Sequence, residues 1–243
     1  MLFSTTTPEA KRTALRQMLA GPSIVQFPGA YTPLSTKLIQ EQGFDGVYIS
    51  GAVLANELGF PDIGLTSLTE VAARAGQIAR ITDLPALVDA DTGFGEPMNV
   101  ARTDIRGTDG LTAATDRAKA LVDAGADAIF PEAMADLSEF EAMRKAVDVP
   151  ILANMTEFGK SQLFTADQLQ EVGVNMIIYP VTLMRSALGA MERVLQTIRA
   201  DRTQEAAVPD MLTRARLYEL VDYNGYNQFD SSVFDFEVPG LHR

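Results

Sequence analysis

A unit made of a helix, a glycine and a short apolar strand occurs three times in this chain, and it constrains the fold more than any other feature. Gly43, Gly125 and Gly173 each precede an apolar strand, near positions 47, 128 and 176. Nearly continuous apolar strands that alternate with amphipathic helices are typical of a parallel sheet covered by helices. Right-handed crossovers then leave two main architectures, a (β/α)8 barrel or an open doubly wound sheet.

Further strands are expected near positions 24, 87 and 151, which gives about six in all. Helices are expected over residues 8–19, 33–42, 67–81, 110–124, 135–147, 165–172 and 182–200. No Gly-x-Gly-x-x-Gly follows a strand and no Gly-x-x-x-x-Gly-Lys is present, which weakens the nucleotide-binding open sheet. The predicted fold class is therefore α/β, of the (β/α)8 TIM-barrel type but incomplete, because a full barrel has eight strands.

The missing strands point to the segment between residues 91 and 111, which is too short to hold further βα units. We expect a barrel domain over residues 1–200, truncated between about 99 and 109, and a helical and aromatic tail over residues 201–243. The tail is expected to be helical from residue 209 to about 221. Its aromatic side chains are expected to pack on the domain itself or on a neighbouring subunit, because aromatic residues are enriched at interfaces.

Composition narrows the possible chemistry. The 243 residues contain no cysteine, which excludes a disulfide scaffold, a thiolate metal site and a cysteine nucleophile. The single histidine is His242, so a histidine triad would depend on the end of this chain. The net charge is −12 and no basic cluster occurs, so nucleic acid is not an expected partner.

The N-terminal segment and the apolar segments predict the location. Residues 1–12 contain no long apolar run, so no signal peptide is expected. No segment has the uninterrupted apolar length of a membrane span. We therefore expect a cytoplasmic protein with no membrane partner.

Two aspartates at the end of an apolar run are the first candidate site. Asp89 and Asp91 follow Ala86-Leu87-Val88, and a turn bracketed by Gly93 and Gly95 comes next. If the strand continued through them, alternation would put both carboxylates on one face, roughly 7 Å apart. Such a pair suits a hard cation such as Mg²⁺. An ordinary Asp-rich turn explains the same residues, so both interpretations stand at this point.

In a barrel, the ends of the strands would gather polar side chains at one mouth, where barrel enzymes keep their sites. These side chains are Ser50, Asp89, Asp91, Glu132, Asn154, Thr156 and Tyr179. Simpler roles are open for several candidates. Glu132 could cap the next helix, Asn154 and Thr156 could satisfy loop backbone groups, and Arg185 and Arg214 could be solvated helix residues.

The order and number of short motifs resemble the isocitrate lyase / phosphoenolpyruvate mutase superfamily, and within it most of all the 2-methylisocitrate lyases. The motifs lie at residues 48–51, 58–64, 87–95, 99–103, 129–133, 151–159 and 213–219. The resemblance implies a barrel, Mg²⁺ and cleavage of a carbon–carbon bond beside a carboxylate. In the lyases, methylisocitrate is split into pyruvate and succinate. A homo-oligomer formed through the C-terminal tail is also expected.

The resemblance also implies roles for individual residues of this chain. Asp89 and Asp91 would hold the metal with support from Asp62. The backbone N–H groups of Ser50, Gly51 and Ala52 would bind a substrate carboxylate. The rest of the substrate pocket would consist of Arg102, Glu132, Asn154, Thr156, Arg185 and Arg214. Arginines suit a di- or tricarboxylate or an α-keto acid, because the guanidinium fork binds carboxylates bidentately.

The chain also departs from the pattern it resembles. In the family, a Lys-Lys/Arg-Cys-Gly-His motif follows the fourth strand, and its cysteine is the catalytic acid/base. This chain has neither that motif nor the fourth-strand glutamate that supports the metal. Ala101-Arg102-Thr103 matches both the segment after the third strand and the end of the fifth. Omission of about 50 residues, or one and a half to two βα units, accounts for both matches.

This departure keeps three functions open. The first is a methylisocitrate lyase with weak or absent activity and no catalytic residue of the family type. The second is another reaction of the superfamily, such as oxaloacetate decarboxylation or phosphonopyruvate-type chemistry. The third is a non-catalytic barrel remnant. A gapped barrel also has free strand edges, which predicts low stability or dependence on oligomerisation.

Overall fold

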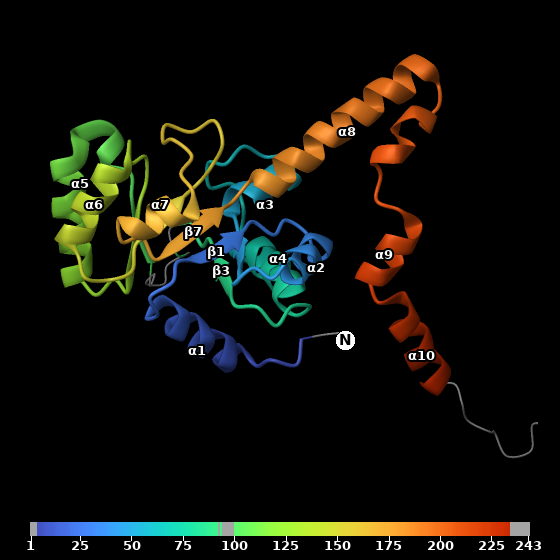
Figure 1. The fold of residues 1–243 in the computed structure, drawn as a ribbon, viewed down its shortest axis with the longest axis horizontal. Coiled ribbons are helices and arrows are strands. Elements are labelled where there is room, and N and C mark those ends of the chain that lie inside the picture. The colour runs from blue at the N-terminus through green and yellow to red at the C-terminus, as the bar shows by residue number, and fades with distance from the viewer. Residues whose placement is uncertain (1–3, 92, 94–99, 234–243) are drawn as a thin grey trace, which may run out of the picture.

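The fold is seen in a computed structural model that describes residues 4–91, 93 and 100–233 (Figure 1). Residues 92, 94 and 95 of the 87–95 motif and residue 99 of the 99–103 motif lie outside the described residues. Residues 1–3, 96–98 and 234–243 lie outside them as well. The strands are β1 (Val25–Pro28), β2 (Val47–Ile49), β3 (Ala86–Val88), β4 (Val100–Thr103), β5 (Ala128–Pro131), β6 (Leu152–Asn154) and β7 (Met176–Tyr179).

The strands form one curved, parallel wall. Four ladders join β2 to β3, β1 to β7, β6 to β7 and β4 to β5. Single bridges from Gly29 to Tyr48 and from Ile129 to Ile151 complete the order β3-β2-β1-β7-β6-β5-β4. Within the described part of the chain, no ladder joins β3 to β4. The α/β barrel-type fold is confirmed, and its wall is open between these two strands.

The expected number of strands was wrong by one, because β4 was missed. Its residues Val100-Ala101-Arg102-Thr103 are too few and too polar to stand out as a strand in the sequence. They become a strand because β5 pairs with them from Val100↔Ala128 to Thr103↔Pro131. Tertiary pairing overrides a weak local preference here.

Helices fill the connections between the strands. Those of the body are α1 (Pro8–Leu19), α2 (Pro33–Glu41), α3 (Gly51–Glu57), α4 (Leu68–Ala79), α5 (Arg106–Asp123), α6 (Leu137–Ala146) and α7 (Ala166–Glu171). Their starts follow local chemistry, since Thr7, Thr32, Ser67 and Thr165 each accept a hydrogen bond from a backbone N–H of the first turn. Residues 51–57, over which no helix was expected, form α3, and α5 begins at Arg106 rather than at residue 110, with a kink at Gly110.

The core has two layers because side chains alternate along each strand. Ile129, Ile151 and Ile177 point outward and pack with Phe140 and Met143 of α6. The alternate residues fill the interior of the wall, among them Phe27, Phe130, Leu152 and Ile178, with Leu15 and Leu19 of α1 packed against them. Both layers are almost fully buried on the β1, β7, β6 and β5 side.

The C-terminal segment is an arm that leaves the body (Figure 1). It consists of α8 (Thr182–Asp201), the 3-10 helix η2 (Glu205–Asp210), α9 (Arg214–Leu220) and α10 (Tyr223–Val233). The predicted helix from 209 to 221 is therefore split, because Met211 is extended and α9 begins at Arg214. The arm meets α2 through an ion pair between Arg216 and Glu41 at 2.5 Å.

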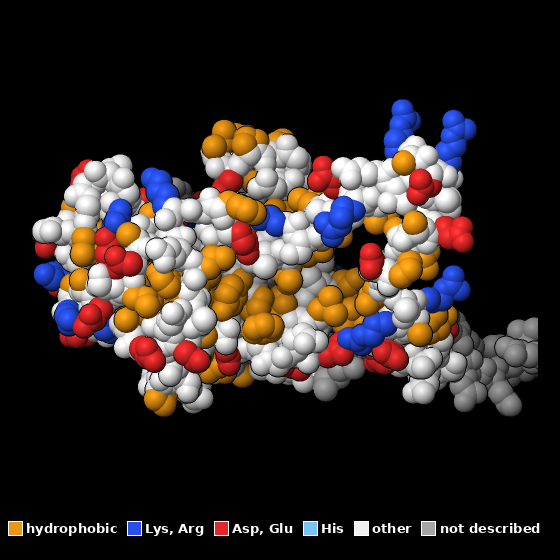
Figure 2. All heavy atoms as spheres, turned by 45° about the horizontal axis from the view of Figure 1, so that its top comes forward, with side chains coloured by type: hydrophobic (Ala, Val, Ile, Leu, Met, Phe, Trp, Pro, Cys, Tyr) orange, Lys and Arg blue, Asp and Glu red, His pale blue; other side chains and the backbone are white. Residues whose placement is uncertain are grey.

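The arm exposes much of its apolar surface. None of the residues of α8 is buried, and the exposed fractions of Leu188, Met191 and Leu195 are 53, 54 and 65%. Hydrophobic side chains also gather on the body beside the arm (Figure 2). No helix among the described residues is long and apolar enough to cross a membrane.

Candidate active site

Asp89 lies at the mouth, directly after β3. Its backbone N–H donates to the carbonyl of Ile49 at 2.9 Å, which continues the ladder between β2 and β3 by one residue. The Tyr48 hydroxyl donates to Oδ2 of Asp89 at 3.2 Å. On its other side, a Cβ added to Gly51 would lie 3.3 Å from Cγ of Asp89. The small residue at position 51 thus lets the start of α3 approach this carboxylate closely.

Asp91 occupies a turn and does not continue the strand. Its φ is 47°, and its N–H donates to Oδ1 of Asp89 at 3.0 Å. The expectation that both carboxylates share one face of a strand is therefore wrong, because the strand ends at Val88. The turn interpretation therefore describes the local backbone.

Three carboxylates influence one another at this mouth. Burial raises the pKa of Asp62, and the charge of Asp89 raises it further. Burial also raises the pKa of Asp91, followed by the charges of Asp89 and Asp62. Among the described residues, however, no group of three or more acidic, histidine or cysteine side chains has the arrangement of a metal site. The structure brings the three predicted carboxylates into one region without forming a closed set of ligands.

A second polar cluster follows β4, β5 and β6. The N–H of Glu132 donates to the Thr103 carbonyl at 3.0 Å, which fixes the end of β5 beside β4. The Glu132 carboxylate receives Nδ2 of Asn154 at 3.2 Å and an ion pair from Arg102 at 3.3 Å. Arg102 also lies over the Phe130 ring, 5.0 Å from its centre. Glu132 thus contacts two other predicted pocket residues, Arg102 and Asn154.

Two buried oxygens of this cluster have no hydrogen-bond partner among the described residues. They are Oγ1 of Thr103 and Oδ1 of Asn154. Buried polar atoms are nearly always satisfied, so each of these two oxygens has room for a hydrogen bond that the described residues do not supply. Thr103 is the last residue of β4, and Asn154 is the last residue of β6.

Tyr48 connects the two clusters electrostatically. Its pKa is raised well above its usual range by burial first, and then by the charge of Asp89 and the hydrogen bond to it. The charge of Glu132 also raises this pKa, while Arg102 opposes it. The Tyr48 hydroxyl therefore stays protonated and donates to Asp89, a role that the sequence did not assign to it.

The segment predicted to bind a carboxylate through its backbone begins α3. Ser50 is the N-cap residue, and its Oγ accepts from the N–H of Val53 at 3.4 Å. The first N–H groups of a helix have no acceptor within the helix. The N–H groups of Gly51 and Ala52 are among them, so the start of α3 has donors beside Asp89.

Arg185 and Thr156 lie on another part of the rim, Arg185 in the first turn of α8 and Thr156 in the loop after β6. Nη1 of Arg185 donates to the Glu157 carbonyl at 2.6 Å, and it contacts Oγ1 of Thr156 at 3.4 Å. It also pairs with the Glu157 carboxylate at 3.2 Å. Sequence reasoning left Glu157 without a role, although it stands inside the 151–159 motif.

Arg214 is not brought to the mouth of its own chain. It is an exposed residue at the start of α9, in the arm. The neighbouring Arg216 contacts Glu41, the last residue of α2, and helix α2 ends on the side of the wall away from the mouth. The cause is the direction of α8, which carries the arm off the body (Figure 1).

The fold and the mouth define a (β/α)-barrel protein with a carboxylate-rich site, and comparison with known proteins gives its family. The sequence model of phosphoenolpyruvate phosphomutase matches residues 15–106 and 100–199. The chain is 45% identical to the probable 2-methylisocitrate lyase 2 of Corynebacterium glutamicum, over 98% of this chain and 97% of that protein. The chain therefore belongs to the phosphoenolpyruvate phosphomutase family.

Solved structures agree with this fold. The crystal structure of 2,3-dimethylmalate lyase, a member of the PEP mutase/isocitrate lyase superfamily, has a TM-score of 0.82 at 24% identity, and the match covers 93% of this chain and 98% of that one. Phosphonopyruvate hydrolase, solved with oxalate and Mg²⁺, has a TM-score of 0.80 at 21% identity, over 93% and 99% of the two chains.

The same comparisons reveal an internal difference in length. The alignment with the C. glutamicum lyase spans 297 positions, 54 more than the 243 residues of this chain. At least 54 positions of that alignment therefore have no residue of this chain opposite them. The two matches to the family model share residues 100–106, which include all of β4. One strand of this chain is thus similar to two different places in the family.

Proposed function

We propose that the mouth is a methylisocitrate lyase site, built for Mg²⁺-dependent cleavage of 2-methylisocitrate to pyruvate and succinate. The observation that carries the proposal is the 45% identity to a probable 2-methylisocitrate lyase over 98% of the chain. The charged groups at the mouth fit a substrate with several carboxylates, because arginine side chains and free N–H groups lie beside acidic residues that suit a metal.

The residues that would hold Mg²⁺ are Asp89 and Asp91, with support from Asp62. Their chemistry fits, since carboxylate oxygens are the ligands that Mg²⁺ prefers. Asp89 raises the pKa of both other carboxyl groups, and a divalent cation would relieve this repulsion. When bound, the metal would polarise the substrate's oxygen atoms and stabilise negative charge that develops on the pyruvate fragment.

Residues of the chain itself would bind and orient the substrate. The N–H groups of Gly51 and Ala52 would donate to one carboxylate, while Tyr48 keeps the Asp89 carboxylate in place by its hydrogen bond. Arg102 and Arg185 would bind the remaining carboxylates. Both arginines are paired, Arg102 with Asp104 and Glu132 and Arg185 with Glu157, so substrate would have to share or exchange these contacts.

We further propose that the missing positions lie between β3 and β4 and that their loss impairs the reaction. The overlap of the two family matches at residues 100–106 supports this position. The chain contains no cysteine, so the acid/base that the family resemblance implies is lacking. General acid–base catalysis contributes about 10²- to 10⁴-fold, which sets the size of the expected defect.

A direct assay tests the function. The chain and the C. glutamicum relative are each given 2-methylisocitrate and Mg²⁺, and pyruvate release is measured. We expect the chain to be slower by about 10²- to 10⁴-fold, with the residual rate abolished in Asp89→Asn. Equal turnover in both proteins would overturn the proposed impairment. Residual turnover unaffected by Asp89→Asn would overturn the metal role.

The exposed apolar surface of the arm supports a homo-oligomer, which we propose as the working form. The exposed residues Leu188, Met191 and Leu195 recur at helical spacing on α8. Beside the start of α8, the body has an apolar cavity of about 340 Å³, lined in part by Leu38, Ile39 and Phe44 of the α2 region and by Leu183. A second copy would cover such surfaces. Because Arg214 lies on the arm, the way in which the two copies pack would also determine the position of Arg214.

A further inference from the structure

We propose that Arg74 is a positioning residue for the mouth. It holds the end of α3 against the loop after β1, and this keeps the start of α3 beside Asp89. The inference rests on the proposed function for the meaning of the mouth. The contacts that carry it belong to the fold itself, so they can be tested without a substrate.

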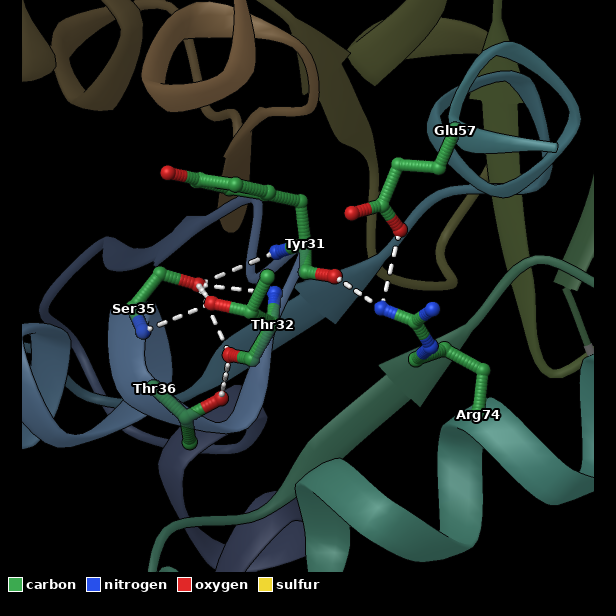
Figure 3. Close-up of polar contacts among 6 residues, drawn as sticks. All are labelled: Tyr31, Thr32, Ser35, Thr36, Glu57 and Arg74. Carbon is green, nitrogen blue, oxygen red and sulfur yellow. Dashed lines mark hydrogen bonds and ion pairs between the residues drawn. The ribbon is translucent and has the colours of Figure 1, made fainter. Parts of the chain in front are cut away.

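One guanidinium nitrogen makes both contacts (Figure 3). Nη1 of Arg74, on α4, donates to the Tyr31 carbonyl at 2.8 Å and to Oε2 of Glu57 at 2.9 Å. The side chains of Arg74 and Glu57 are only 26 and 21% exposed. Charge-assisted hydrogen bonds in partly buried surroundings are stronger than surface ion pairs. A single side chain thus joins three elements of the rim.

The loop that carries Tyr31 is a firm anchor. The N–H of Ala30 donates to the Tyr48 carbonyl at 2.8 Å. On the other side of Tyr31, Thr32 and Ser35 form a reciprocal capping box, and the Thr36 hydroxyl donates to the Thr32 carbonyl at 3.0 Å (Figure 3). The Tyr31 carbonyl is therefore fixed from both directions. Arg74 links this carbonyl to Glu57 at the end of α3.

Helix α3 needs such an anchor because it is short and its far end leads into an exposed segment. It has seven residues, well below the length at which a helix is stable alone. After Glu57, the exposed fractions of Leu58, Phe60 and Ile63 are 40, 43 and 71%. Among the ion pairs of the described residues, Glu57 with Arg74 is the one that holds the boundary between α3 and this segment.

The segments before and after Glu57 in the chain both contribute groups to the mouth. Toward the N-terminus, α3 begins at Gly51, whose position allows only 3.3 Å between a Cβ and Cγ of Asp89. Toward the C-terminus, Asp62 follows Glu57 by five residues and takes part in the carboxylate group. A shift at Glu57 would therefore move an N–H donor and a carboxylate relative to Asp89 at once.

Hydrogen exchange of backbone amides tests the positioning without a ligand. In Arg74→Met we expect the amides of residues 53–58 to exchange about tenfold faster than in the wild type. In Arg74→Lys we expect a smaller increase, because an ammonium can still reach one acceptor. The matched control is Arg106→Met, which removes a comparable pair with Glu139 at 2.6 Å, 27 and 13% exposed, between α5 and α6.

The control should leave exchange at residues 53–58 unchanged. Wild-type exchange at these amides in a folded Arg74→Met protein would overturn the inference. Glu57→Gln provides a second variant that keeps an acceptor for Arg74 while it removes the charge. If Arg74→Met does not fold, unchanged exchange in both Arg74→Lys and Glu57→Gln would overturn the inference equally.

Calorimetry with oxalate in Mg²⁺ buffer then tests whether the position of α3 affects the affinity of the mouth for a carboxylate. We expect Arg74→Met to weaken oxalate binding about tenfold, and Arg106→Met to leave it unchanged. Faster exchange with unchanged oxalate affinity would overturn the link between α3 and the site. If the wild type binds no oxalate, the proposed Mg²⁺ and carboxylate site fails, while the exchange experiment still decides the role of Arg74 in the fold.

Discussion

The two sides of the strand wall differ in how completely they are built. On one side, β1, β7, β6 and β5 each have a neighbour on both edges, and Ile151 and Ile177 are fully buried. On the other side, β3 pairs only with β2 and β4 only with β5 within the described residues, and Val88 is 38% exposed. The wall is continuous where the family match is continuous, and it opens where that match doubles back on residues 100–106. The most buried core therefore lies on the continuous side of the wall. The acidic cluster and the Arg102 cluster lie on opposite flanks of the opening.

The largest expected effect separates the two sides by stability. Ile177→Ala removes a fully buried side chain from the continuous side and should cost about 3 kcal/mol of unfolding free energy. Val88→Ala, on the open side, should cost less than about 1 kcal/mol, because the side chain is already partly hydrated. Urea unfolding measures both values. Equal costs would break the contrast between the two sides.

A smaller effect tests whether β4 is secured to the continuous side of the wall. Glu132 follows β5, and its carboxylate pairs with Arg102 of β4 and also accepts a hydrogen bond from Asn154 of β6. Glu132→Ala leaves Nδ2 of Asn154 without its acceptor, while Arg102 keeps its pair with Asp104 at 2.9 Å, and the variant should destabilise the chain by about 1–3 kcal/mol. Proteolysis within residues 100–106 should also become faster. Unchanged proteolysis would show that the strand ladder alone secures β4.

The arm is expected to matter for assembly rather than for folding. Leu195→Glu changes a residue that is 65% exposed, so the unfolding free energy of the monomer should change by no more than about 0.5 kcal/mol. In sedimentation experiments the same variant should shift the protein toward the monomer, whereas Glu192→Gln should not. An unaltered oligomer in Leu195→Glu would remove α8 from the interface.

The smallest effect concerns acid stability at the entry to β3. Hydrogen bonds from Ser4 and Thr6 lower the pKa of Asp83 from its ordinary 3.8 to about 2. Because the folded pKa is the lower one, the stabilisation is present above pH 3.8 and is lost as the pH falls toward 2. The difference in unfolding free energy between wild type and Asp83→Asn should therefore shrink over this range. A difference that stays constant with pH would contradict the role of the Asp83 charge.

Local chemistry explains which parts of the fold the sequence could predict. Helical periodicity placed most helices of the body within a few residues, as with the expected ranges 8–19 for α1 and 67–81 for α4. Strand β4 was missed because its local signal is weak and it depends on pairing with β5. Helix α3 was missed although Ser50 caps it, because it has only seven residues.

The mouth shows the same division. Residues at the ends of adjacent strands, such as Glu132 and Asn154, could be grouped from strand order alone. Tyr48 and Glu157 could not be assigned, since their roles depend on which way a side chain turns. Arg214 depends on the direction of α8, which the pattern of residues along the helix does not determine.

Restoring the missing segment is the most direct test of the claim that this chain holds only part of a lyase site. The segment of the C. glutamicum relative that has no counterpart here would be inserted between β3 and β4, and pyruvate release from 2-methylisocitrate would be measured with Mg²⁺. We predict a gain of at least about 100-fold over the chain as it stands, the lower range of an acid–base contribution. A folded, restored chain with no gain in rate, or an unaltered chain already as fast as its relative, would contradict the claim.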